Sequence, residues 1–122
     1  MREESPDPTG FKAILTDECW EHIITRHPEM TPFRERVREA LRQPDAIYSG
    51  KRDPTRRIYR RRYLQVSGVG GPLDLLVFVG SAKENWKGHV ATSYFAAYSF
   101  RMLGALIWPT SSSGGQIREG GF

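Results

Sequence analysis

The chain has 122 residues, of which 39% are apolar, so it can form one domain with a modest core. Its single cysteine, Cys19, excludes an internal disulfide and a cysteine-rich metal site, and it indicates a reducing compartment such as the cytoplasm. The formal net charge is +4, and seven of the twelve residues from 51 to 62 are Lys or Arg. That concentration favours a polyanionic partner, whereas the apolar runs at 75–79 and 102–108 are too short to cross a membrane.

Composition also suggests how the chain is divided. Residues 1–10 are charged and contain two prolines, which predicts a flexible lead that is not a signal peptide. Residues 109–122 are rich in Ser and Gly, which predicts a flexible tail. A single domain is therefore expected over residues 11–108.

Two helices are predicted in the first third of the chain. Thr16 has the position of an N-cap, and apolar residues then recur with helical spacing, which predicts a helix over 17–27. Thr31 and Pro32 predict the start of a second helix, which continues to about residue 42.

Strands are predicted after the helices, joined in an antiparallel meander. They are expected at 46–49, 57–66, 73–79 and 89–95. The side chains of the second strand alternate, so that one face carries Arg57, Tyr59, Arg61 and Tyr63. The apolar segment 100–108 is expected to dock on the core as a helix turn or an extra strand. The expected fold class is α+β, with two N-terminal helices packed on an antiparallel sheet of about four strands.

Metal and nucleotide-cofactor sites are not expected. His22 and His27 are about 140° apart on the first helix, so they do not share a face as two ligands of one zinc ion would. The glycines between 68 and 71 lie between two predicted strands, which is typical of a hairpin and not of a phosphate-binding loop. We therefore expect neither a metal nor a cofactor.

The residue types suit acid–base cleavage of RNA, because RNA carries its own nucleophile, the 2′-hydroxyl. The protein then supplies a base, an acid, cations for the phosphorane and groups that hold the bases. His27, slightly preferred, and His22 are the candidates for proton exchange, and Tyr59, Arg61 and Thr92 are the candidates for holding the phosphate. The residues expected to bind RNA are Lys51, Arg52, Arg57, Arg60, Arg62, Tyr63 and Ser93.

Each candidate also has a purely structural interpretation. His27 fits a buried histidine or a cation at the C-terminus of a helix, and His22 fits a solvated side chain. The arginines fit a solvated strand face or an ion-pair network with Glu35 and Glu39, and the tyrosines, Thr92 and Ser93 fit ordinary strand residues. The residue types alone leave both interpretations open.

The order of the motifs resembles a known family. The string Trp20-Glu-His22-Ile-Ile-Thr-Arg-His27-Pro28-Glu29 is similar to the W-x-H-I…H-P-E opening of the phage-associated PBECR domains, which are grouped with barnase, EndoU, the colicin ribonucleases and RelE. Residues 37–47 resemble the second helix of that family with its P-D-x-I ending. The basic strand at 58–61, the apolar strand at 75–79 and the V-x-T-x-Y segment at 90–94 follow in the same order.

This resemblance covers about residues 15–97 and implies a RelE/barnase-like, metal-independent endoribonuclease. It implies use as a toxin or phage effector, with an antitoxin or immunity protein as a further partner. It places His22, His27, an arginine or tyrosine of the strand 57–63 and Thr92 at the active face. Two other hypotheses stand beside it: a non-catalytic RNA- or protein-binding module with a degenerate nuclease fold, and a structural phage component in which the segment 100–108 makes oligomer contacts.

Overall fold

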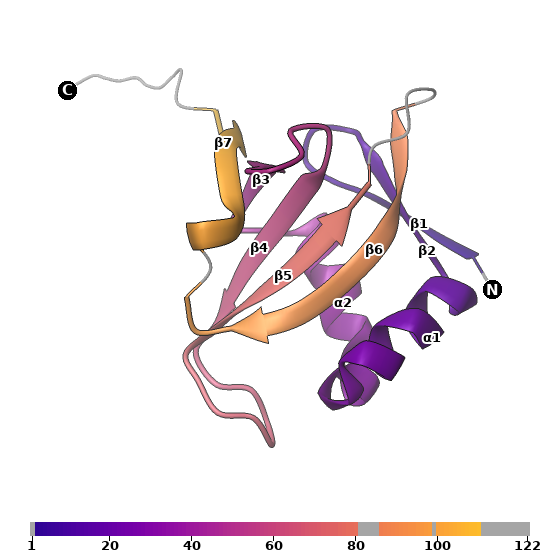
Figure 1. The fold of residues 1–122 in the computed structure, drawn as a ribbon, viewed down its shortest axis with the longest axis vertical. Coiled ribbons are helices and arrows are strands. Elements are labelled where there is room, and N and C mark those ends of the chain that lie inside the picture. Colours follow the sequence, from indigo (N-terminus) through magenta and orange to yellow (C-terminus); the bar gives the residue numbers. More distant parts are fainter. Residues whose placement is uncertain (1, 81–85, 99, 111–122) are drawn as a thin grey trace.

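The computed structural model describes residues 2–80, 86–98 and 100–110. In this part of the chain, seven strands form one mixed sheet in the order β1-β2-β6-β5-β4-β3-β7 (Figure 1). Strands β2 and β6 are parallel, and every other neighbouring pair is antiparallel. The strands are β1 (Arg2–Pro6), β2 (Lys12–Thr16), β3 (Ala46–Gly50), β4 (Arg57–Tyr63), β5 (Leu73–Val79), β6 (Lys87–Ala96) and β7 (Leu103–Trp108).

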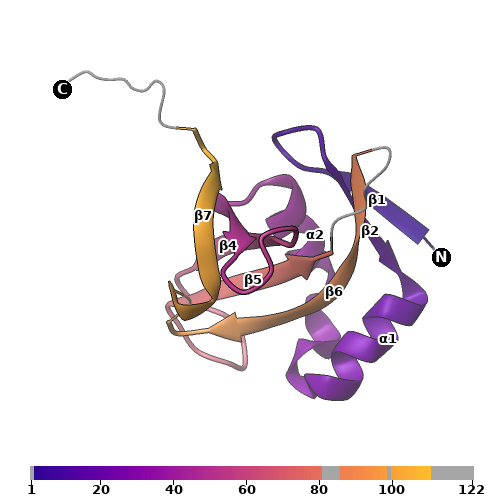
Figure 2. The ribbon, with the colours of Figure 1, turned by 45° about the horizontal axis from the view of Figure 1, so that its top comes forward.

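Both α-helices lie against the same face of the sheet (Figure 2). They are α1 (Asp17–Arg26) and α2 (Arg34–Arg42). Their apolar residues Trp20, Ile23, Val37 and Leu41 join Val77 and other β5 side chains in the main core. This face is called the helix face here, and the opposite face is called the open face. A smaller cluster on the open face contains Ile58, Leu76 and Phe78.

The predicted helix boundaries agree closely with the structure. Thr16 is the N-cap of α1, and its Oγ1 accepts a hydrogen bond from the backbone N–H of Cys19 over 3.1 Å. The second helical segment differs at its start, because a 3₁₀ helix, η1 (Pro28–Phe33), precedes α2. The Thr31 hydroxyl donates to the Pro28 carbonyl over 2.7 Å inside η1, so Thr31 does not cap α2.

The prediction of two N-terminal helices on a four-stranded antiparallel sheet is wrong. The predicted strands are present as β3 to β6, but β1 and β2 come before the first helix, and β7 adds a strand beside β3. The β1 sequence has no apolar pattern that would predict a strand. Its backbone pairs with β2, and Glu3 lies at ion-pair distance from Arg34 and Arg38 of α2. Residues 2–6, which were expected to belong to a flexible lead, therefore form an edge strand.

Both alternatives for the apolar segment 100–108 occur, one after the other. A short 3₁₀ helix, η2 (Phe100–Met102), leads directly into β7. The predicted tail 109–122 lies outside the described residues from position 111 onward.

Candidate functional site

The alternation predicted for β4 is confirmed, but its Arg–Tyr side faces the helices. Tyr59 has no exposed surface, and its hydroxyl donates a hydrogen bond to Asp7 Oδ2. Arg57 Nη1 lies 3.2 Å from the same oxygen, and its guanidinium lies 4.4 Å from the ring centre of Phe11 and 4.9 Å from that of Trp86. Burial raises the pKa of Tyr59 well above its usual value, so the hydroxyl keeps its proton and remains a donor. A side chain without exposed surface cannot contact RNA, so Tyr59 is not part of the candidate site.

The outer end of β4 makes a second polar cluster with α2. The Tyr63 hydroxyl donates to Glu39 over 2.6 Å, and Arg61 donates to the Gln43 carbonyl while its Nε lies 3.7 Å from Glu39. The hydrogen bond from Tyr63 lowers the pKa of Glu39, and desolvation raises the pKa of Tyr63. Arg61 and Tyr63 therefore join the sheet to α2, on the helix face.

Two other predicted cations of β4 are directed to the open face. Arg60 and Arg62 both pair with the buried Asp74 of β5, at 3.5 Å and 3.3 Å. Ser93, also predicted to bind RNA, is fully buried, and its hydroxyl donates to the Leu76 carbonyl over 2.7 Å. Arg60 and Arg62 thus remain on a face that a ligand can reach, and Ser93 does not.

His27 lies at the end of a row of aromatic rings. Its ring centre is 5.2 Å from that of Tyr94 on β6, and the Tyr94 ring stacks on Phe78 of β5 at 5.4 Å. His27 Nδ1 lies 3.6 Å from Glu29 Oε2, which leaves Nε2 as the nitrogen available to a ligand. Burial raises the pKa of Tyr94, so its hydroxyl remains protonated at neutral pH. We name His27, Tyr94 and Phe78 the aromatic row.

The structure places Thr92 beside this row and His22 outside it. Thr92 is half-buried, pairs with Phe78 in the β5–β6 register, and precedes Tyr94 by two residues on the same face. His22 is exposed on α1 and has no hydrogen bond or ion pair within the described residues. Of the five predicted catalytic residues, Thr92 therefore lies on the open face, and His27, at the C-cap of α1, reaches that face through its contact with Tyr94.

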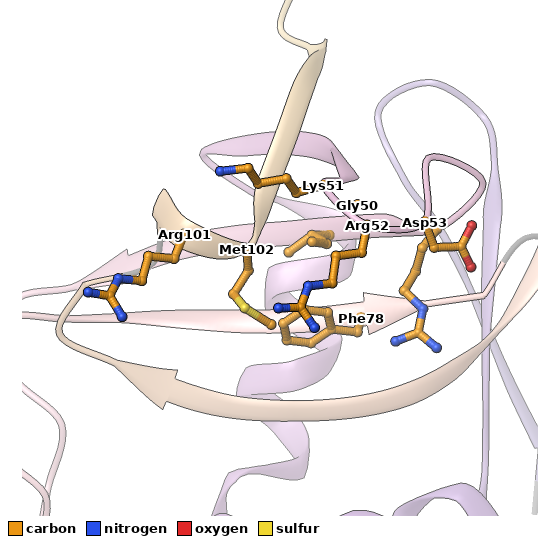
Figure 3. Close-up of a pocket in the computed structure, with 9 residues that line it drawn as sticks. Gly50, Lys51, Arg52, Asp53, Phe78, Arg101 and Met102 are labelled. Carbon is orange, nitrogen blue, oxygen red and sulfur yellow. The ribbon is translucent and has the colours of Figure 1, made fainter.

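A pocket of about 490 Å³ opens between the β3–β4 loop and η2 (Figure 3). Its volume falls within the range of about 300–1,000 Å³ that is typical of small-molecule sites. In Figure 3 the side chains of Arg52 and Met102 reach toward Phe78, whereas those of Lys51 and Arg101 extend outward. We name it the loop pocket, and it is lined by Gly50, Lys51, Arg52, Asp53, Arg56, Ile58, Phe78, Arg101 and Met102.

Backbone contacts hold the two walls of the loop pocket together. The Lys51 N–H donates to the Met102 carbonyl over 3.2 Å, which links the loop to η2. Within the loop, Asp53 Oδ1 accepts hydrogen bonds from the Thr55 N–H and hydroxyl over 3.1 Å and 2.6 Å. A Cβ on Gly50 would lie 2.4 Å from the Asp53 carbonyl oxygen, so the loop closes this tightly only around a glycine. The loop is thus ordered before any ligand arrives.

Sequence reasoning missed several residues of this face. Tyr94 carries a signal that was available, because it follows Thr92 by two residues and so shares its face of the strand. Phe78 lies inside a continuous apolar run, which conceals the face to which each residue points. Arg101 has no local signal, because it reaches the loop pocket only through the pairing of β7 with β3.

Two further findings bear on the kind of site this is. Among the described residues, no group of three or more His, Cys, Asp or Glu side chains could hold a metal ion. No helix in the same part of the chain is long and apolar enough to span a membrane.

No protein-family model, curated protein or solved structure matches this chain. The resemblance to PBECR domains therefore stays a prediction, and the function is inferred from the residues of the open face.

Proposed function

We propose that this chain is a metal-independent endoribonuclease that binds RNA along the open face and cleaves it beside His27. The observation that carries the proposal is the aromatic row, which runs from an imidazole to Phe78 in the floor of a cationic pocket. Aromatic rings stack bases and cations bind phosphates, and this combination holds single-stranded RNA. The reducing compartment that the single cysteine favours also contains RNA.

The chemistry at His27 needs only groups that this face and the substrate possess. The 2′-oxygen of the RNA forms a bond to phosphorus while the bond from phosphorus to the 5′-oxygen breaks. One proton leaves the 2′-hydroxyl and one reaches the 5′-oxygen. The products are a 2′,3′-cyclic phosphate and a new 5′-hydroxyl end. An imidazole suits either proton transfer, because it can accept a proton at one ring nitrogen and donate it again, which makes histidine the most frequent general acid or base.

Neighbouring groups suit supporting roles. Glu29 lies beside Nδ1 and would orient the ring so that Nε2 faces the RNA. The protonated Tyr94 hydroxyl and the Thr92 hydroxyl are donors for a non-bridging phosphate oxygen. Arg60 supplies positive charge on the same face, although its pairing with Asp74 reduces its effect.

A matched pair of histidine variants tests the proposal. With single-stranded RNA in excess EDTA, His27→Ala is expected to cleave at least about 100-fold more slowly than the parent chain, because general acid–base catalysis contributes roughly 10²–10⁴-fold. His22→Ala is the control, since His22 is exposed on the same helix and lies outside the aromatic row. Its rate should stay within about twofold of the parent rate, and thermal melting should show that both variants are folded. An unchanged rate in His27→Ala would remove His27 from the reaction.

A non-catalytic RNA-binding module is the second candidate. The observation in its favour is that Tyr59 and Arg61, both predicted to be catalytic, are engaged in structural contacts with Asp7, Gln43 and Glu39. This candidate predicts that the parent chain binds RNA with a steep salt dependence and releases no product. The same assay therefore separates the two, because it measures bound RNA and cleaved RNA together.

A further inference from the structure

Ion pairing divides the Lys and Arg residues of the described chain into two groups. The first group pairs with carboxylates and consists of Arg2, Arg34, Arg36, Arg38, Arg57, Arg60, Arg61, Arg62 and Lys87. The second group has no ion pair among the described residues and consists of Lys12, Arg26, Arg42, Lys51, Arg52, Arg56 and Arg101. The last four of these gather at the loop pocket, and the other three lie on separate elements.

This clustering is costly unless an anion is bound. Cations around one pocket repel one another, and among the lining residues only Asp53 opposes this repulsion, through its attraction to Arg56. Asp53 is the single acidic lining residue, and its Oδ1 already accepts two hydrogen bonds from Thr55. The other arginines of the same basic stretch are matched with Asp7, Glu39 or Asp74, so within this stretch the cations without an ion pair are those at the pocket.

The floor of the loop pocket has the opposite character. Ile58 and Phe78 pair across β4 and β5 and are only 2% and 3% exposed, so Met102 of the η2 wall, which is 45% exposed, supplies most of the apolar surface that a ligand can reach. A ligand that matches both parts carries a negative group at the rim and a flat apolar ring at the floor. A nucleotide has both, because its phosphate binds guanidinium groups and its base packs on apolar and aromatic side chains.

We infer that the loop pocket binds a nucleotide bearing a phosphomonoester. A phosphomonoester carries about 1.5–2 negative charges at neutral pH, whereas an internal phosphodiester of RNA carries one. Three guanidiniums and one ammonium around a single acid suit the more highly charged group. The inference deepens the proposed function and rests on it for the choice of nucleotides. The ligand has two sources, the 5′-phosphorylated end of an RNA strand and a free mononucleotide.

Paired ligands that differ by one phosphate test this inference. We would measure Kd for 5′-AMP and adenosine, and for one short RNA with a 5′-phosphate or a 5′-hydroxyl, using RNA made uncleavable by 2′-O-methylation. The phosphorylated member of at least one pair should bind at least about tenfold more tightly, as expected for a charge-assisted contact. Preference in the RNA pair alone identifies strand ends as the source, and preference in the AMP pair identifies the free mononucleotide. Equal affinities within both pairs would overturn the inference.

Surface variants locate the effect. Arg52→Gln and Arg101→Gln should each reduce the preference for phosphate by at least about threefold, whereas Arg42→Gln, which removes an equally unpaired arginine far along the chain on α2, should not change it. A preference that survives in Arg52→Gln and Arg101→Gln would place the phosphate elsewhere and overturn the assignment. Failure here is distinct from failure of the proposed function. If His27→Ala loses cleavage but the parent shows no preference for phosphorylated ligands, the proposed enzyme is retained and the pocket assignment is rejected. If the parent prefers phosphorylated ligands but His27→Ala cleaves as fast as the parent, the pocket assignment is retained and the role of His27 is rejected.

Discussion

Asp7 is the residue on which the buried polar contacts of the N-terminal region depend. Its Oδ1 accepts hydrogen bonds from the Thr9 N–H and hydroxyl and from the Phe11 N–H, and its Oδ2 accepts those of Tyr59 and Arg57. The Asp7 side chain has no exposed surface, and that of Arg57 is 10% exposed. One carboxylate therefore connects the turn after β1 to the middle of β4.

Asp7→Asn is expected to lower the free energy of unfolding by about 3–5 kcal/mol, because it leaves Arg57 as a buried charge without a counter-charge. Urea unfolding followed by tryptophan fluorescence measures this loss. Glu18→Gln makes the same chemical change at an exposed position without an ion pair, and it should alter stability by no more than about 0.5 kcal/mol. Equal effects of the two variants would contradict the structural role of Asp7.

Glu39 gives the contact between α2 and β4 a dependence on pH. The hydrogen bond from Tyr63 lowers the pKa of Glu39 from its ordinary value of 4.5, so folding favours the ionised form. Such a group contributes stability in full above its unfolded pKa, and this contribution is lost as the pH falls through the folded pKa. Below pH 4.5 the parent should therefore lose stability more steeply than Glu39→Gln does. Urea midpoints between pH 7 and pH 3 check this, and parallel curves would contradict it.

Among the elements, β7 contributes little to the main core, and it holds in place the η2 wall of the loop pocket, which directly precedes it. It runs beside β3, and Gly104 allows a close approach, since a Cβ there would lie 2.8 Å from Ser49 Oγ and 2.9 Å from the Ser49 carbonyl oxygen. The Ala105 N–H donates to Ser49 Oγ over 3.0 Å across the same interface. The position of Arg101 and Met102 therefore depends on a glycine in the next element.

Gly104→Val is expected to displace β7 from β3, because a branched side chain cannot fit against the Ser49 backbone. Hydrogen exchange at the Ala105 amide should become at least about tenfold faster, which corresponds to a decrease of about 1.4 kcal/mol in local stability. The preference of the loop pocket for a phosphorylated ligand should fall in parallel. Ala105→Val adds bulk at an exposed position of the same strand and serves as the control. Unchanged exchange in Gly104→Val would show that the pairing of β3 with β7 is not needed to hold η2.

The sequence predicted those elements whose signals are local. Thr16 predicted the start of α1, and the central strands were recognisable from apolar runs and alternation. Strand β1 was missed because its partners lie in β2 and α2, and the parallel β2–β6 pair was missed because it joins residues 12–14 to 87–89. At the site, alternation correctly grouped Tyr59 with Arg57 but could not show which side of β4 the helices would cover. Because the helices cover the side of β4 with Tyr59, the candidate site lies on the opposite face of the sheet, with Phe78 and Tyr94.

In the molecule as a whole, the cations of β4 and those of the loop pocket differ in their pairing. The arginines of β4 pair with carboxylates on both faces of the sheet, whereas the four cations at the rim of the loop pocket have no ion pair among the described residues. For single-stranded RNA, each phosphate that a protein neutralises contributes about 0.7 to the slope of log affinity against log salt concentration. The double variant Arg52→Gln/Arg101→Gln should therefore lower that slope by about 0.7 for each phosphate that it no longer binds. Arg61→Gln removes a matched cation of the helix face and should leave the slope unchanged. Equal changes of the slope in both variants would mean that RNA affinity depends on the total charge of the protein and not on the position of the cations.

The parallel pairing of β2 with β6 also affects how the chain is made. Lys12 pairs with Lys87 and Ile14 with His89, so the N-terminal strands have no partner on that side until most of the chain has left the ribosome. During this interval the apolar residues of β2 and the free edge of β5 are open to other nascent chains. Contacts so distant along the chain also slow folding. Synthesis that stalls before residue 87 would thus leave a fragment inclined to aggregate.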